Sequence, residues 1–212
     1  IEDGAVLILN DKIAQVGDFV SVNKSVSNDV ERVDHRPHLI MAGFIDTHIH
    51  FPQMQVIGSY GTKLLDWLNK YTFVEEQKFA SEEHWARIAM LFFDELVRHG
   101  TTTAMAYCSV HRASADAFFS EAGKRNMCMI GGKVLMDRNA PEKLRDTPQS
   151  GYDDSKALIA KWHGRGRSLY AISPRFGITS SDAQLEMTQS LVREFPDCHV
   201  QTHLSENDAE IA

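Results

Sequence analysis

The sequence predicts an α/β protein in which short strands alternate with longer helices around a parallel sheet. Apolar β-type runs recur from residue 39 onward, and capped helical segments lie between them. Strand and helix alternate at intervals of roughly 30 residues, which is typical of βα units. The predicted strands are Leu39–His50, Thr101–Tyr107, Cys128–Met136, Leu169–Ile172 and His199–Leu204.

The first 38 residues are expected to form part of a small N-terminal β domain. Residues 5–20 contain two short apolar strands separated by Asn10-Asp11-Lys12, where the side chains tolerate left-handed turn geometry. Residues 21–36 are polar without a sustained period, so we expect a loop or an edge strand. The second expected domain, residues 39–212, contains the βα units.

The predicted helices have ordinary end signals. One begins with Ser81 as its N-cap and ends at His99-Gly100. Further helices are expected at residues 114–123, 154–164 and 181–195. The apolar face of the first helix is expected to contain Ile88, Leu91, Phe92 and Leu96.

Composition excludes several classes of protein. The formal net charge of −7 disfavours a nucleic-acid partner, because a protein that binds phosphates needs a basic face. Three widely spaced cysteines predict neither a disulfide framework nor a zinc ribbon, and they favour a reducing, cytoplasmic compartment. No membrane span or signal peptide is recognisable. Since the chain begins without Met, we expect it to be an internal piece of a longer protein.

His48 and His50 lie at the end of the first long apolar run. Side chains two positions apart on a strand point to the same side, so both imidazoles can reach one metal ion. Zinc binds neutral imidazole nitrogens at about 2.0–2.1 Å. Two polar side chains bonded to backbone or water would explain the pattern equally well.

A third histidine favours the metal interpretation. His203 ends another apolar strand, and Ser205 is predicted to cap the next helix in a capping box. Glu206 would then lie in the first helical turn, where it could serve only the helix dipole. Because the C-terminal ends of parallel barrel strands form the active-site face, these residues could converge with His48 and His50.

Arg175 and Phe176 follow another predicted strand. An arginine can donate to a carbonyl oxygen and an aromatic ring can cover a flat ligand, although a surface ion pair and a core aromatic are equally compatible. Lys133 is interpreted as a buried stem that reaches a polar partner, and His111 as a supporting or loop residue. Residues 64–68 could line a pocket or a helix core, and GRGR at 164–167 indicates a helix end and loop.

Six blocks of the sequence resemble the guanine deaminases of the metal-dependent amidohydrolase superfamily. The resemblance covers the chain from about residue 39 to its end, and it implies a TIM-type (β/α)8 barrel of which strands 1–5 are present, preceded by part of a small β-sandwich domain. It also implies a homodimer. The blocks are, in order, FIDTHIHFPQ, LLDWLNKYTF, RHGTTT, GKVLMD, SPRF and THLSEN.

The resemblance implies a role for each matching residue. His48, His50 and His203 correspond to ligands of one Zn²⁺ per subunit, and Glu206 corresponds to the proton shuttle. The substrate guanine would be contacted by His203 and Glu206 and by three further residues. Gln53 and Arg175 correspond to hydrogen-bonding residues at the purine edge, and Phe176 to a residue that packs on its ring.

Two features of the chain qualify this resemblance. The end of the fourth barrel strand lacks the lysine that bridges two metals in other superfamily members, which favours a mononuclear site. A further histidine after strand 6 and an aspartate ligand after strand 8 are expected beyond Ala212. The implied reaction is hydrolysis of guanine to xanthine and ammonia in purine catabolism. Alternatives are an aminohydrolase of another purine, a pterin or a triazine, and a metal-free scaffold of the same fold.

Overall fold

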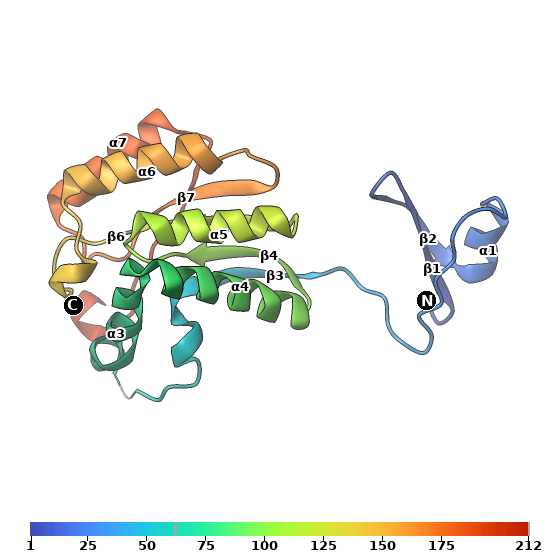
Figure 1. Cartoon of the computed structure of the whole chain (residues 1–212), viewed down its shortest axis with the longest axis horizontal. Helices are drawn as coiled ribbons and strands as arrows, with labels where there is room; N and C mark the ends of the chain where they lie inside the picture. Colours follow the sequence, from blue (N-terminus) through green and yellow to red (C-terminus); the bar gives the residue numbers. More distant parts are fainter. Residues whose placement is uncertain (62, 212) are drawn as a thin grey trace. The chain divides into compact units, whose positions relative to one another are not determined.

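The computed structural model describes residues 1–61 and 63–211. Contacts between residues divide the chain into two compact units, Ile1–Ala42 and Gly43–Ala212. Figure 1 shows the antiparallel hairpin of the first unit and the sheet of the second. A domain boundary between residues 38 and 39 stays a prediction. None of the helices among the described residues has the length and apolar character needed to cross a membrane.

The first unit contains the two predicted strands. β1 (Gly4–Leu9) and β2 (Lys12–Asp18) pair antiparallel, and both residues of the connecting turn, Asn10 and Asp11, have positive φ angles. The loop expected from residue 21 is partly wrong, because helix α1 (Phe19–Lys24) follows the hairpin directly. Only one residue of α1 is buried. Because the helix packs no continuous apolar face against a core, its sequence lacks the helical period that would have predicted it. That this hairpin belongs to a β-sandwich stays a prediction.

The second unit is built on a parallel sheet, as predicted. Its strand order is β3-β4-β5-β7, with β6 and β8 each pairing with β7, and every pairing is parallel. The strands are β3 (Phe44–His50), β4 (Thr101–Tyr107), β5 (Cys128–Gly132), β6 (Val134–Leu135), β7 (Ser168–Pro174) and β8 (His199–Val200).

The observed strands differ from the predicted ranges at four places. The strand predicted at Leu169–Ile172 is longer at both ends and covers Ser168–Pro174. The first strand begins at Phe44 rather than Leu39, and the last ends at Val200 rather than Leu204. The predicted strand at residues 128–136 is divided at Lys133 into β5 and β6. Gly132 at this division lies so close to β7 that a Cβ there would clash with the carbonyl oxygen of Ala171.

Four long helices pack side by side along the strands (Figure 1). They are α4 (Glu82–Arg98), α5 (Arg112–Lys124), α6 (Pro148–Trp162) and α7 (Asp182–Glu194). Helix α6 begins six residues before the predicted start, because Thr147 forms a capping box with Ser150. The expected apolar face of α4 is correct except at Leu91, which is exposed.

Two clusters of buried side chains stabilise this unit. The larger lies between the sheet and the long helices, and it includes Phe92, Phe93 and Phe118. The smaller cluster includes Tyr107 from the end of β4 and Phe176 after β7. It also receives residues from a segment of short helices between β3 and α4. These are η1 (Phe51–Val56), α2 (Leu64–Trp67), η2 (Leu68–Thr72), α3 (Phe73–Glu76) and η3 (Gln77–Ala80).

Candidate active site

Three histidines from opposite ends of the unit converge in space. His48 and His50 are supplied by β3, and His203 follows β8. Their candidate ligand nitrogens all lie within 4.8 Å of one another. The Nε2 atoms of His50 and His203 are 3.0 Å apart. Two imidazole ligands of one tetrahedral zinc ion, each at 2.0–2.1 Å, would be separated by about 3.3 Å, so these side chains fit a metal ion.

A backbone contact fixes the orientation of the His203 ring. Its Nδ1 lies 2.8 Å from the carbonyl oxygen of Arg175. Because a carbonyl can only accept, Nδ1 is the donor and the lone pair of Nε2 faces His50. Metal-binding histidines commonly donate their second ring N–H to such an acceptor. The main chain after β7 therefore prepares His203 for coordination.

Burial favours the neutral forms of His50 and His203. Desolvation lowers the pKa of His50 well below its ordinary value, and the nearby Arg175 charge lowers it further. The pKa of His203 is also lowered, chiefly by burial. Neutral imidazoles are the form that binds metal, so protons do not compete with a metal ion at neutral pH.

Tyr107 packs against all three histidine rings, a position that its sequence context did not single out. It is fully buried at the end of β4. Its ring stacks on that of His50 with centroids 4.7 Å apart and lies 4.5 Å from His203. Among the described residues its hydroxyl has no hydrogen-bond partner, and burial raises the pKa of this phenol. In the sequence, the one feature that could have pointed to Tyr107 was its place at the end of a predicted strand. In the structure it pairs with His50 in the register of β3 and β4.

Arg175 and Phe176 are both buried after β7. The Arg175 Nη1 atom donates to Oε2 of Glu76 at 2.7 Å, and the guanidinium carbon lies 5.3 Å from the ring centre of Phe73. A surface ion pair, which the sequence also allowed, is therefore wrong for Arg175. Sequence reasoning missed Glu76, since nothing distinguishes it from its neighbour Glu75.

A cavity of about 130 Å³ lies beside these groups. Every predicted site residue lines it, together with residues of α2 and η2 that had been considered for a pocket wall. Its lining consists of His48, His50, Gln53, Leu64, Trp67, Leu68, Arg175, Phe176, His203 and Glu206. The cavity thus combines imidazole nitrogens, a guanidinium, a carboxylate, an amide and aromatic surface.

The prediction for the segment after His203 was wrong in detail. Ser205 has a positive φ of 59° and is not the helix cap, because α8 (Asp208–Ile211) begins later. The Glu210 carboxylate accepts hydrogen bonds from the backbone N–H groups of Ser205 and Glu206 at 3.2 and 2.9 Å. These bonds hold the two residues in a loop. Glu206 is therefore outside the first helical turn, and it lines the cavity from this loop.

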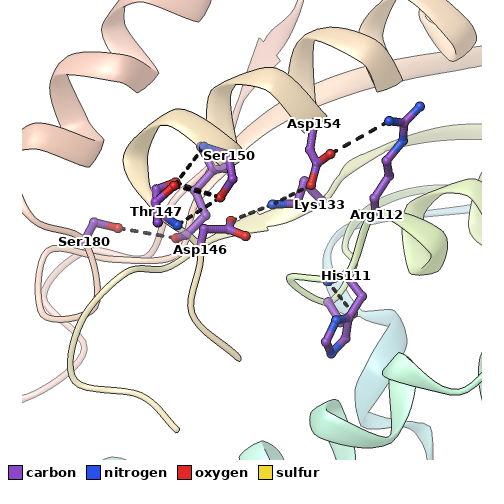
Figure 2. Close-up of polar contacts among 10 residues, drawn as sticks. His111, Arg112, Lys133, Asp146, Thr147, Ser150, Asp154 and Ser180 are labelled. Carbon is purple, nitrogen blue, oxygen red and sulfur yellow. Dashed lines mark hydrogen bonds and ion pairs between the residues drawn. The ribbon is translucent and has the colours of Figure 1, made fainter. Parts of the chain in front are cut away.

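The weaker candidates lie outside the cavity lining. Lys133 is fully buried, and its Nζ lies 2.5 Å from Asp146 and 4.0 Å from Asp154. Figure 2 shows the Lys133 side chain directed at these two carboxylates. This confirms a buried stem with polar partners. His111 is half-buried, and burial lowers its pKa. The GRGR stretch follows α6 as a loop in which Gly164 and Gly166 have positive φ angles, as expected.

Comparison with known proteins places this arrangement among hydrolases. The model of the amidohydrolase family matches residues 39–212. Guanine deaminase of Escherichia coli strain K12 is 48% identical over 212 residues, which cover all of this chain and 48% of that protein. The chain spans about half the length of the curated relatives it matches.

Solved structures agree with the sequence matches. The structure of E. coli guanine deaminase matches with a TM-score of 0.95 and 47% identity over 99% of this chain and 49% of that chain. Guanine deaminase from C. acetobutylicum with guanine bound in its active site matches with a TM-score of 0.86 and 28% identity, over 97% of this chain and 48% of that one. These matches confirm the predicted TIM-type fold class.

Proposed function

Because this chain belongs to the amidohydrolase family, we propose that it forms part of an active site that hydrolyses guanine to xanthine and ammonia. The proposal rests mainly on the composition of the cavity lining. The three histidines, the loop carboxylate of Glu206 and the buried Arg175 surround a single cavity. The relatives named guanine deaminase supply independent support for the substrate.

His48, His50 and His203 are the proposed ligands of one zinc ion per subunit. Support comes from the convergence of their nitrogens and from the Arg175 backbone carbonyl that accepts a hydrogen bond from His203. Zinc at such a site supplies a water whose pKa lies near 7 instead of 15.7. By the family resemblance, an aspartate from a later barrel strand would complete the ligand set.

The remaining residues would bind the purine and move protons. Glu206 is a carboxylate at the cavity wall. In the proposed reaction it does not bind the metal, and it would take a proton from water and deliver it to a ring nitrogen. The hydroxide so formed adds to C2. Its remaining proton is then transferred to the amino group, which leaves as ammonia while C2 becomes the second carbonyl of xanthine. Gln53 and Arg175 would donate to the polar edge of guanine, while Phe176 would pack against the ring.

Substrate turnover by the natural full-length protein tests this proposal. The zinc-loaded protein is assayed with guanine, a pterin and a triazine, and ammonia and the deaminated product are quantified. We expect guanine to have by far the highest kcat/KM. Bound zinc with no guanine turnover and efficient turnover of another heterocycle would assign a different aminohydrolase. Absence of stoichiometric metal would instead support the scaffold alternative.

We further propose a cytoplasmic homodimer that acts in purine catabolism. The dimer rests on the family resemblance, and light scattering of the full-length protein measures it directly. The compartment is supported by the thiols, since Cys108, Cys128 and Cys198 are all free. Cell fractionation tests the location, and recovery of the protein in an extracellular or periplasmic fraction would contradict it.

A further inference from the structure

Helix α3 contacts the Arg175 guanidinium on two sides. Glu76 accepts a hydrogen bond from Nη1 at 2.7 Å, and Phe73 presents its ring face to the guanidinium carbon at 5.3 Å. Residues three positions apart lie on the same helix face, so one short element supplies both contacts. Glu76, Phe73 and Arg175 are all buried, with 1%, 3% and 3% of their surface exposed.

We propose that Glu76 and Phe73 are positioning residues that hold Arg175 for recognition of a ring carbonyl in the substrate. This inference rests on the proposed function and deepens it. Among the described residues, Glu76 is the guanidinium's only hydrogen-bond partner. Arg175 also lines the cavity, so its other N–H groups remain for a ligand.

Glu76 and Phe73 together form a clamp around the Arg175 guanidinium. The chemistry of arginine explains why this clamp gives specificity for a substrate with a ring carbonyl. Its guanidinium is a rigid plane with five N–H donors and no acceptor. When Glu76 fixes one edge and Phe73 covers one face, the directions of the remaining donors are set. A carbonyl oxygen such as O6 of guanine then accepts from them. A purine without that oxygen leaves a buried donor unpaired, which a polar site rejects strongly.

The clamp acts on the side chain of Arg175, whereas His203 is held by the backbone of that residue. His203 is oriented by the backbone carbonyl of Arg175, through Nδ1 at 2.8 Å. Loosening the guanidinium therefore leaves this carbonyl and the metal ligands in place. A positioning role predicts weaker guanine binding with unchanged zinc content, whereas a purely structural ion pair predicts no selective loss.

The test compares Glu76→Gln and Phe73→Leu in the zinc-loaded full-length protein. Glu76→Gln keeps the size of the side chain and removes the charged acceptor of the clamp. Phe73→Leu keeps the apolar character and removes the aromatic ring. The matched control is Glu121→Gln. Glu121 is another buried carboxylate, on α5, which pairs with Arg125 just after that helix and lies outside the cavity lining. We measure KM and kcat for guanine, the inhibition constant of 2-aminopurine, which lacks O6, and zinc content.

We expect KM for guanine to rise about 10-fold or more in Glu76→Gln, with a smaller rise in Phe73→Leu. The inhibition constant of 2-aminopurine and the zinc content should change less than about 2-fold. Unchanged KM, or an equal loss for both purines, overturns the positioning role while wild-type turnover keeps the proposed function. A wild-type protein that neither binds nor deaminates guanine overturns both.

Discussion

The Nε2 atoms of His50 and His203 lie 3.0 Å apart, although 153 positions separate the two residues in the sequence. With Nδ1 of His203 donating to the Arg175 carbonyl, the Nε2 lone pair is directed at His50. The neutral Nε2–H tautomer of His50 can donate a hydrogen bond to this lone pair. When a metal ion is bound, the Nε2 lone pairs of both rings can coordinate it in place of that bond. Burial lowers the pKa of both rings, so the neutral forms that bind metal are favoured.

Glu206 should control catalysis without controlling metal binding. We expect Glu206→Gln to lower kcat about 10²- to 10⁴-fold, because the amide cannot accept and return a proton. Zinc content should stay at the wild-type level, as measured by atomic absorption on the full-length protein. Glu186→Gln, an exposed change on α7, is the control and should leave kcat unaltered. Loss of zinc from the Glu206 variant would indicate that this carboxylate is a ligand.

The ring of Tyr107 should support the histidine ligands by stacking. Tyr107→Leu removes the ring that lies on His50, and we expect zinc affinity to fall about 10-fold, as for other residues that orient metal ligands. Tyr107→Phe keeps the ring and removes only the unpartnered hydroxyl, so its affinity should stay within about 2-fold of wild type. Competition with a chelator measures both values. Equal losses in the two variants would assign the role to the hydroxyl instead.

Gly132 is required for the close approach of β5 and β7. We expect Gly132→Ala to destabilise the protein by about 2 kcal/mol or more, because its Cβ would overlap a backbone carbonyl that cannot easily move. Gly123→Ala on α5 is the matched control, since among the described residues no atom beyond its own turn of helix lies within 4 Å of a Cβ there. That change should stabilise the helix by about 0.5–1 kcal/mol. Urea unfolding measures both, and a tolerated Gly132→Ala would contradict the packing described.

The ion pair of Lys133 with Asp146 should matter for stability. Among the described residues, Asp146→Asn leaves the fully buried ammonium with the more distant Asp154 as its remaining carboxylate partner, and such losses cost about 3–5 kcal/mol. Replacing both partners by Met and Leu should recover much of this, since neither charge remains. Thermal and urea unfolding test the pair. A single variant as stable as wild type would show that Asp154 suffices as partner.

Local spacing and strand ends made part of the site predictable. His48 and His50 follow from the two-residue period of a strand, and His203 from the rule that parallel strands end at one face. The parallel sheet follows from the same periodicity. Strand limits were less predictable, because the break at Lys133 depends on how closely Gly132 approaches the neighbouring strand.

Long-range contacts made the rest unpredictable. Glu76 and Glu75 are chemically identical in the sequence, yet one pairs with Arg175 in the interior and the other with Lys78 near the surface. The capping box expected at Ser205 fails because the carboxylate of Glu210 holds the preceding loop. Such outcomes depend on the folded backbone rather than on a local pattern.

Anomalous diffraction at the zinc absorption edge, from crystals of the full-length protein, tests the central claim most directly. We predict one strong peak per chain, at about 2.0–2.1 Å from a ring nitrogen of each of His48, His50 and His203. A peak at other residues, or no peak after incubation with zinc, would contradict the proposed metal site.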